Sequence, residues 1–295
     1  MQIPSRSCLV AVCITAIAII FAVPTPGQVL TPAELKTSRA LEAARSNPLE
    51  LELFLTEMPK GTDLHMHLTG AVYAESFIRA AAEDQLCVNP AALAFTKPEH
   101  KSDDAAKGPA CEPGNVPASQ AFRDQHLYDE LIDSFSMRSF VPVTGATGHD
   151  HFFDSFDKFG GTDHRHKGEW LYEVATRAAA QNIQYMELME TPPFGRSAAA
   201  AHEVGWNPDL PKMREALLAK LGKGLEQDRD DDLAFFAEAE KTRDKLGHCG
   251  QADAQPACHV TQKFIYQVLR HLIHQLVRFL FVHDVHAVAD AFGVA

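Results

Sequence analysis

Three short apolar segments, set far apart in the chain, constrain the fold most strongly. Residues 62–68 (TDLHMHL), 183–190 (IQYMELME) and 259–269 (HVTQKFIYQVL) have the length and composition of β-strands. The stretches between them are too long for hairpin loops and contain apolar residues at helical spacing, which is typical of the crossovers between parallel strands. The sequence therefore predicts an α/β fold with a parallel sheet, of which about three strands are identifiable.

Helices are expected between these strands and before the first of them. Thr31 and Glu34 form a capping-box pattern at the start of an apolar-periodic stretch that ends near Leu55. The remaining helices are expected over residues 71–85, 125–140 and 170–181 and within 196–246. The acidic run at 228–232 (DRDDD) is interpreted as a solvated turn, because it lacks the alternating oxygen ligands and central glycine of a calcium loop.

The N-terminal 29 residues have the form of a secretory signal peptide. Arg6 precedes an apolar run over residues 8–23, and a proline-rich stretch follows it. The run is short for a transmembrane helix, which needs about 20 apolar residues. An uncleaved membrane anchor is the alternative. We expect a secreted or periplasmic protein with no membrane contact after the leader is removed.

Four cysteines remain after the leader: Cys87, Cys111, Cys249 and Cys258. An even number in an exported chain favours disulfides, and four cysteines allow three pairings. Cys87 with Cys111, and Cys249 with Cys258, each enclose a polar segment with proline or glycine, and this context favours those two pairs. Free thiols are the alternative if the leader is misinterpreted. Residues 87–120 are accordingly expected to be a disulfide-tied insertion.

The charge of the chain excludes some partners. With 39 acidic and 27 basic side chains, the formal net charge is −12. Such a field repels phosphate backbones and anionic lipid headgroups, so nucleic acid is not expected as a partner. The sequence leaves the oligomeric state open.

His65 and His67 lie at the end of the first predicted strand. Side chains alternate along a strand, so both imidazoles lie on one face. In a parallel barrel the carboxyl ends of the strands form the active-site face, and neutral imidazole is a ligand that zinc prefers. A surface pair without a metal is the alternative interpretation.

Four further histidines form two more His-x-His pairs: His149 with His151, and His164 with His166. They stand in polar, glycine-bearing sequence without strand periodicity. We therefore expect them in a loop near the mouth of a pocket rather than in a second metal site, since a catalytic zinc requires three fixed protein ligands.

The stretch MPKGTDLHMHLTGA, residues 58–71, resembles the first-strand motif of the adenosine deaminase family. The cysteine-bearing insertion is similar to that of the secreted, growth-factor-related branch of the family. The segment FFDSFDKF, residues 152–159, resembles the phenylalanine-rich helix that covers the nucleoside pocket. The second and third strands are similar as well, so the resemblance covers about residues 48–270.

The resemblance implies a (β/α)8 TIM barrel and zinc-dependent hydrolytic deamination of adenosine, or of a related purine nucleoside, to inosine and ammonia. It implies that His65 and His67 are zinc ligands. Phe153, Phe156 and Phe159 are candidates for packing against the base, with a plain core helix as the alternative. Thr69 stands where the family has an aspartate, and its hydroxyl can still form a hydrogen bond with a ribose oxygen.

The later motifs of the family are absent from the sequence. Its third zinc histidine, acid glutamate and late aspartate pair have no counterpart, so the catalytic acid is unassigned. Residues 271–295 instead predict an atypical amphipathic helix. We therefore expect an incomplete barrel that lacks the C-terminal half of the family pattern. The alternative function is a catalytically inactive member that binds a nucleoside or a protein.

Overall fold

The computed structural model describes residues 30–101, 103 and 108–267 of the chain. The expected leader, residues 1–29, and the expected tail, residues 271–295, lie outside the described residues. The chain divides into two compact units, Met1–Met58 and Pro59–Ala295.

The first unit contains two helices, α2 (Pro32–Ala44) and α3 (Pro48–Glu57). The predicted capping box is confirmed: Thr31 N donates to Glu34 Oε2 at 2.6 Å, and Glu34 N donates to Thr31 Oγ1 at 3.3 Å. The Asn47 side chain caps α3, whose first residue is a proline. Both helices therefore begin where local capping satisfies their free backbone N–H groups.

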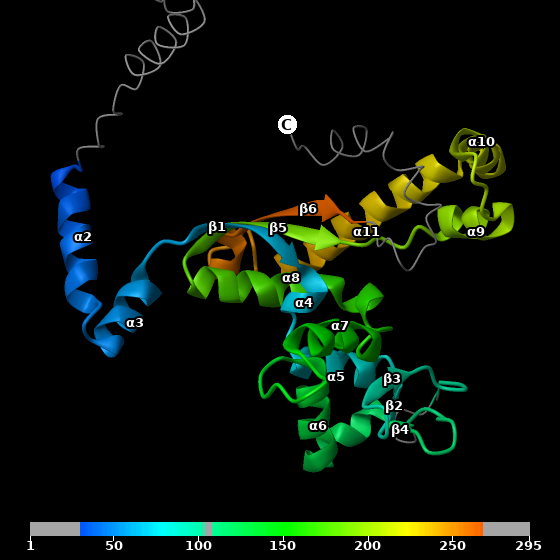
Figure 1. Ribbon diagram of the computed structural model, residues 1–295, viewed down its shortest axis with the longest axis horizontal. Coiled ribbons are helices and arrows are strands. Elements are labelled where there is room, and N and C mark those ends of the chain that lie inside the picture. Colours follow the sequence, from blue (N-terminus) through cyan, green and yellow to red (C-terminus); the bar gives the residue numbers. More distant parts are fainter. Residues whose placement is uncertain (1–29, 102, 104–107, 268–295) are drawn as a thin grey trace, which may run out of the picture. The chain divides into compact units, whose positions relative to one another are not determined.

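The centre of the second unit is a parallel sheet in the order β1–β5–β6 (Figure 1). Its strands are β1 (Gly61–His67), β5 (Ile183–Glu190) and β6 (Thr261–Tyr266), which confirms the three predicted strands. In register, His67 pairs with Met189, which pairs with Ile265. The α/β class and the parallel sheet are confirmed. In the described part of the chain the sheet is open and is not a closed barrel.

Long crossovers join the three strands, as the sequence predicts. The first consists of α4 (Leu68–Ala71), α5 (Ala74–Glu83), a small second sheet, a 3-10 helix (Ala118–Phe122), α6 (Gln125–Phe135), α7 (Gly148–Lys158) and α8 (Asp163–Ala180). The second consists of α9 (Gly195–Val204), α10 (Leu210–Leu221), α11 (Gly224–Leu246) and a short 3-10 helix (Pro256–His259).

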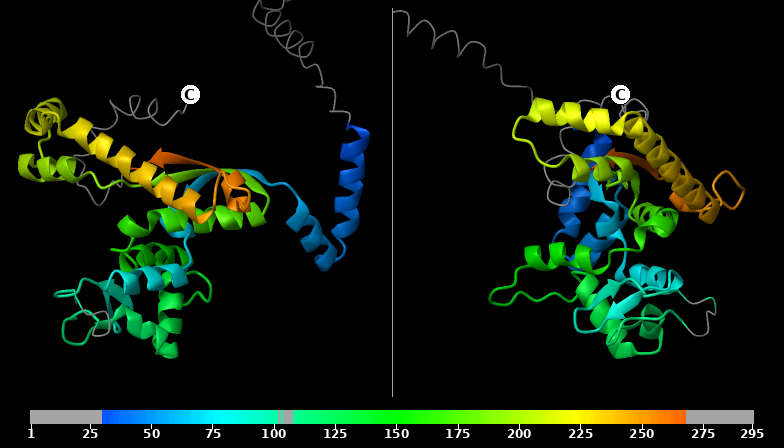
Figure 2. Two further views of the ribbon diagram at one scale, coloured as in Figure 1. Left: turned by 180° about the vertical axis from the view of Figure 1, so that it is seen from behind. Right: turned by 90° about the vertical axis from the view of Figure 1, so that its right-hand side faces the viewer.

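Helices α8 and α11 pack together beside the sheet (Figures 1 and 2). Gln262 of β6 donates a hydrogen bond to the Leu171 carbonyl of α8 at 3.0 Å. Phe236 of α11 stacks on Phe264 of β6, with 4.7 Å between the ring centroids. These contacts fix both helices against one face of the sheet.

The small second sheet occupies the cysteine-bearing insertion. It is antiparallel, in the order β3–β2–β4, with β2 (Cys87–Asn89), β3 (Ala94–Thr96) and β4 (Val116–Pro117). Disulfides join Cys87 to Cys111 and Cys249 to Cys258, as the loop context favours. Disulfides are typical of proteins that fold outside a reducing cytosol. No helix among the described residues is long and apolar enough to cross a bilayer.

The histidine pairs outside β1 lie in helices, so their expected loop placement is wrong. His149 and His151 belong to the first turn of α7, where a capping box between Thr147 and Asp150 starts the helix. His166 belongs to the first turn of α8 and is buried. The backbone of His164 is also in α8, but its side chain lies outside the described residues. Polar helix termini resemble loops in composition, which explains the error.

The acidic run at 228–232 is also placed differently from the expected solvated turn. It lies within α11, and Asp228 and Asp232 are buried. Asp228 accepts hydrogen bonds from the Ser197 backbone N at 2.8 Å and from Ser197 Oγ at 2.6 Å. Asp232 accepts a hydrogen bond from the Tyr266 hydroxyl at 2.6 Å. Partners on α9 and β6, distant in sequence, thus make buried carboxylates tolerable.

The two buried aspartates have opposite pKa shifts. Burial raises the pKa of Asp232 to about 6, although the Tyr266 hydrogen bond opposes this shift. Burial also raises the pKa of Asp228, but the hydrogen bonds from Ser197 and Arg196 outweigh that effect and hold its pKa below the usual range. Their contributions to stability therefore change in different pH windows.

The close crossing of α8 and α11 generates the first prediction. A Cβ atom at Gly168 would lie 2.4 Å from Thr242 Cβ and 2.7 Å from the Ala239 carbonyl oxygen. Gly168→Ala should lower the free energy of unfolding by about 3 kcal/mol, because the helices must separate. Urea unfolding followed by tryptophan fluorescence measures this. Gly195→Ala is the matched control, since a Cβ there meets nothing within 4 Å. Equal stability of the two variants would contradict the close crossing.

The second prediction concerns Asp232. Because its folded-state pKa is raised, its contribution to stability is present below the unfolded-state pKa of about 4 and is lost as pH rises through about 6. The asparagine of the Asp232→Asn variant does not ionise, so the variant does not lose stability in this way. Above pH 7 its free energy of unfolding should exceed that of the wild type by about 3 kcal/mol. The comparison is the free energy of unfolding of both proteins at several pH values. A stability difference that does not change with pH would contradict the raised pKa.

Candidate functional site

The candidate site lies at the carboxyl ends of the parallel strands. His67 ends β1 and Glu190 ends β5, while Gln267 follows β6 and donates its backbone N–H to the Glu190 carbonyl at 2.8 Å. Parallel pairing brings these three strand ends to one edge of the sheet. In open α/β sheets this edge is where ligands bind.

His65 and His67 lie side by side, as the alternation predicts. Their ring centroids are 5.5 Å apart, and the ring planes are inclined at 74°. A register shift between Asp63 and Met66 shows that β1 is irregular at this point. The Asp63 carboxylate accepts a hydrogen bond from the His65 backbone N at 3.2 Å. His65 is exposed and His67 is half-buried, so both imidazoles can be reached from solvent.

A cavity of about 310 Å³, here called the strand-end cavity, adjoins His67. Its lining combines residues from the strand ends with aromatic residues of the crossover helices. The side chains include those of His67, Thr69, Phe77, Phe156, Asp157, Phe159, Lys167, Trp170, Met189, Glu190, Thr191 and Gln267. The volume is at the lower end of the usual range for small-molecule sites, about 300–1,000 Å³.

Lys167 and Glu190 form a buried ion pair in the wall of this cavity. Lys167 Nζ lies 2.6 Å from Glu190 Oε2, and both side chains are almost completely buried. The ammonium also lies 5.5 Å from the centroid of the Trp170 ring. The pair thus joins the first turns of α8 to the end of β5, and it lines the same cavity as His67.

A second cavity of about 720 Å³, here called the α7 cavity, also includes His67. Side chains of α7 make up most of its lining, and Phe140, Ala146 and Gln267 complete it together with His67. Those from α7 are His149, Asp150, His151, Phe152, Phe153, Asp154, Phe156 and Asp157. His67 therefore lies where the α7 cavity meets the strand-end cavity.

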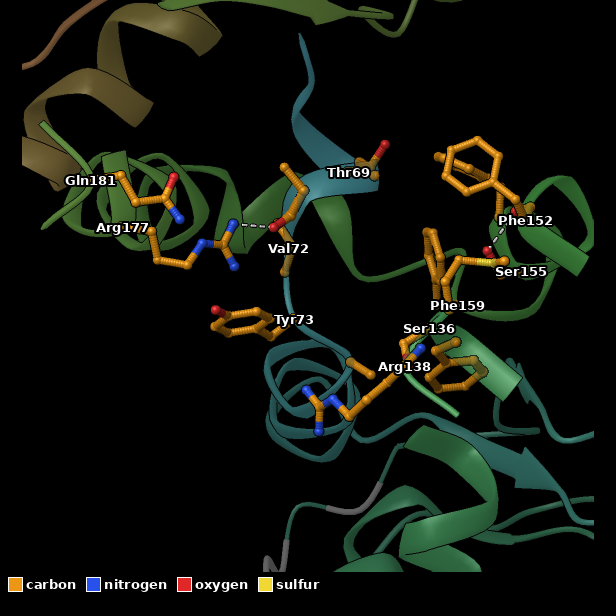
Figure 3. A pocket seen from close by; sticks show the side chains of 16 residues that line it. Thr69, Val72, Tyr73, Ser136, Arg138, Phe152, Ser155, Phe159, Arg177 and Gln181 are labelled. Carbon is orange, nitrogen blue, oxygen red and sulfur yellow. Dashed lines mark hydrogen bonds between the residues drawn. The ribbon is translucent and has the colours of Figure 1, made fainter. Parts of the chain in front are cut away.

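A third cavity, of about 360 Å³, contains two arginines and is here called the arginine cavity (Figure 3). Arg177 donates to the Ala71 carbonyl and lies 4.0 Å from the centroid of the Tyr73 ring. Arg138 forms two hydrogen bonds to the Glu75 carboxylate, at 2.6 and 3.1 Å. Both guanidinium groups therefore already have partners within the protein.

The predicted phenylalanines have three different environments. Phe156 lines all three cavities. Phe153 lines the α7 cavity and is 57% exposed. Phe159 is buried and stacks on Phe77 with 4.1 Å between centroids, so it also belongs to the core. Thr69 lines the strand-end and arginine cavities.

Gly70 allows Phe156 to lie close to the end of β1. A Cβ at Gly70 would be 3.2 Å from Phe156 Cζ, which is a tight contact. The glycine of the quoted motif therefore has a steric role at the wall of the site.

The described residues offer an incomplete set of metal ligands around β1. Two imidazoles match the ligand preference of zinc, but a catalytic zinc has three protein ligands and a water. Among residues 30–101, 103 and 108–267, three ligand side chains lie close enough together to share one metal ion, and they belong to Glu83, His166 and Glu169. This group does not include either histidine of β1. The β1 pair thus fits zinc in donor chemistry and supplies two ligands.

Sequence reasoning missed several lining residues. Glu190 and Gln267 carry a weak signal, because they lie at or just after the predicted strand ends. Phe152 belongs to the quoted phenylalanine-rich segment and lines two cavities. Lys167 gives no local signal, since its burial depends on Glu190, 23 positions later in the chain.

The third prediction concerns the buried ion pair. Lys167→Met should lower the free energy of unfolding by about 3–5 kcal/mol, because it leaves a buried carboxylate without its cation. The double variant with Glu190→Met should recover part of that loss. Both are measured by urea unfolding at pH 7. If the double variant is as unstable as the sum of the single variants, the two side chains are not coupled.

Comparison with known proteins leaves the family open: no protein-family model and no curated protein matches the chain.

Proposed function

We propose that the chain carries the nucleoside- and metal-binding part of a hydrolytic deaminase that acts on adenosine or a related purine nucleoside. The observation that carries the proposal is the His65–His67 pair at the carboxyl end of a central parallel strand, with 5.5 Å between the rings. The likeness of residues 58–71 to the first-strand motif of the adenosine deaminase family supports the same reaction.

Zinc is the proposed metal, because imidazole nitrogen is among its preferred ligands. When bound in such an enzyme, zinc lowers the pKa of a water molecule and so supplies a hydrolytic nucleophile near neutral pH. His65 and His67 would hold it, each through a neutral ring nitrogen. The Asp63 carboxylate accepts a hydrogen bond from the His65 backbone N–H and so holds the backbone at that ligand.

The cavity residues are proposed to bind the nucleoside. Phe156, shared by all three cavities, supplies an apolar surface against which a flat base can pack. The Thr69 hydroxyl can form a hydrogen bond with the sugar, and Glu190 and Gln267 line the same space. Enclosure by aromatic side chains also excludes water, which strengthens polar contacts to the substrate.

The wider architecture proposed is a (β/α)8 barrel. The strands β1, β5 and β6 are adjacent in the order in which they occur along the chain, which is the arrangement of successive barrel strands. The two disulfides support the proposal that the protein is secreted or periplasmic.

A catalytically inactive nucleoside-binding protein is the second candidate. The observation in its favour is that the described residues supply two ligands at β1, where a catalytic zinc needs three. The cavities could still hold a nucleoside without turnover.

The fourth prediction tests the proposed reaction. The full chain should contain zinc and release ammonia from adenosine. The double variant His65→Ala/His67→Ala should lose one equivalent of zinc and reduce ammonia release at least 100-fold. Metal content is measured by atomic emission and ammonia by a coupled assay. His126→Ala, an exposed histidine on α6, is the matched control and should change neither.

Two outcomes would contradict the proposal. If the double variant contains as many equivalents of zinc as the wild type, the β1 pair is not a ligand pair. If wild-type protein binds adenosine in calorimetry but releases no ammonia, the inactive binding protein is the correct assignment.

A further inference from the structure

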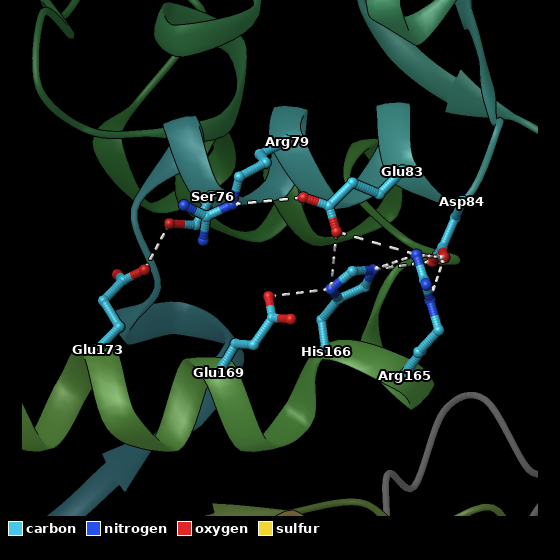
Figure 4. A network of polar contacts seen from close by, with 8 residues as sticks. All are labelled: Ser76, Arg79, Glu83, Asp84, Arg165, His166, Glu169 and Glu173. Carbon is cyan, nitrogen blue, oxygen red and sulfur yellow. Dashed lines mark hydrogen bonds and ion pairs between the residues drawn. The ribbon is translucent and has the colours of Figure 1, made fainter. Parts of the chain in front are cut away.

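A histidine and two glutamates come together at the junction of α5 and α8 (Figure 4). Glu83 is the last residue of α5, while His166 and Glu169 lie in the first turns of α8. Their potential ligand atoms all lie within 4.8 Å of one another. His166 Nδ1 lies 3.1 Å from Glu169 Oε2 and 3.9 Å from Glu83 Oε2.

The other ring nitrogen of His166 faces a third carboxylate. Nε2 lies 3.3 Å from Asp84 Oδ2, and Asp84 is held in turn by Arg165 at 2.6 Å. The His166 side chain is 1% exposed. A histidine that binds a metal through one nitrogen commonly donates its second N–H to a carboxylate, which orients the ring. In this group Nε2 faces both the Asp84 carboxylate and the Arg165 guanidinium, whose Nη2 lies 3.4 Å away.

The tautomer of His166 decides which of its ring nitrogens can bind a metal ion. A neutral imidazole carries one N–H: with the proton on Nδ1 the ring donates to Glu169 and accepts from Arg165, and with the proton on Nε2, toward Asp84, it presents a lone pair at Nδ1. That lone pair faces the carboxylates of Glu83 and Glu169. In this second tautomer a metal ion between the three groups relieves the electrostatic repulsion between the lone pair and the two carboxylates.

The surroundings of Glu83 favour a metal ion. Its carboxylate lies 4.0 Å from Arg79 and 3.9 Å from Arg165, which exceeds hydrogen-bonding distance. The carboxylate can therefore turn toward an ion without breaking a short hydrogen bond to either arginine. The Glu83 and Glu169 side chains are 47% and 37% exposed, so water molecules can complete the coordination.

We propose that His166 Nδ1, Glu83 and Glu169 bind a divalent transition-metal ion of the zinc class. One nitrogen and two carboxylate oxygens are a ligand set that such ions accept. The ion clips the end of α5 to the start of α8, two segments that are 83 positions apart between Glu83 and His166. The site shares no residue with the β1 histidine pair, and the proposal does not depend on deaminase activity.

The fifth prediction tests this site in the full-length double variant His65→Ala/His67→Ala, from which the proposed deaminase ligands are absent. Metal-free protein of this variant should still bind one equivalent of zinc in calorimetry and one of Co²⁺ in visible absorption. It should also gain thermal stability when zinc is added. Adding Glu83→Gln and Glu169→Gln should weaken zinc binding at least 100-fold.

Glu238→Gln, on the exposed surface of α11, is the matched control and should leave zinc binding unchanged. Because the glutamine variants could unfold, their metal-free melting temperatures are compared with that of the parent protein. Reduced zinc binding counts only for a variant that retains the parent melting transition, and the single Glu169→Gln variant provides a milder test.

Two results would overturn the proposal. In the first, the His65→Ala/His67→Ala protein binds no zinc, and the His166 group is then a network of hydrogen bonds and ion pairs without a metal. In the second, zinc binds equally well with and without the glutamine substitutions, and the ion then occupies another site. Failure of the deaminase proposal would give a different result: the wild type and the His65→Ala/His67→Ala variant would then contain the same number of zinc equivalents.

Discussion

The rest of the second unit depends on the first turns of α8, where three consecutive residues contact three other parts of the fold. His166 lies against the carboxylates at the end of α5, Lys167 forms its ion pair with Glu190 at the end of β5, and Gly168 lies against α11. Successive residues of a helix point about 100° apart, so three neighbours can contact three different elements. This short stretch determines where the strand ends stand relative to the helices that enclose the site.

The position of the candidate site follows from that packing. Parallel strands bring the ends of β1 and β5 to one edge, and the ion pair of Lys167 fixes α8 beside this edge. Phe156 of α7 then lies close to Gly70 and closes one wall. The two proposed metal sites differ in character. His67 of the β1 pair lines two cavities and His65 is exposed, so both can be reached from solvent, whereas the His166 group joins two helices. The two proposals thus assign similar ligands to different roles, the first to chemistry and the second to stability.

Features that depend on neighbours in the sequence could be predicted. The neighbouring imidazoles of β1, the capping box at Thr31 and the enclosed polar segments of the disulfides are local patterns, and the structure contains all of them. Features that depend on distant partners could not. Asp232 looks solvated in a run of acidic residues, but Tyr266 and the packing of α11 bury it. His149 and His166 look like loop residues because helix termini share the polar composition of loops.

The sequence by itself determined the α/β class, the positions of the strands and the two imidazoles on one strand face, because each follows from spacing along a single segment. It favoured two cysteine pairs by loop context, but the structure decided among the three possible pairings. The tertiary structure alone decided that Lys167 and Glu190 share the wall of a cavity with His67, that Asp228 and Asp232 are buried, and that Glu83 meets His166. The physical reason is that burial and ion pairing depend on which residues meet in space, and segments remote in sequence set those contacts.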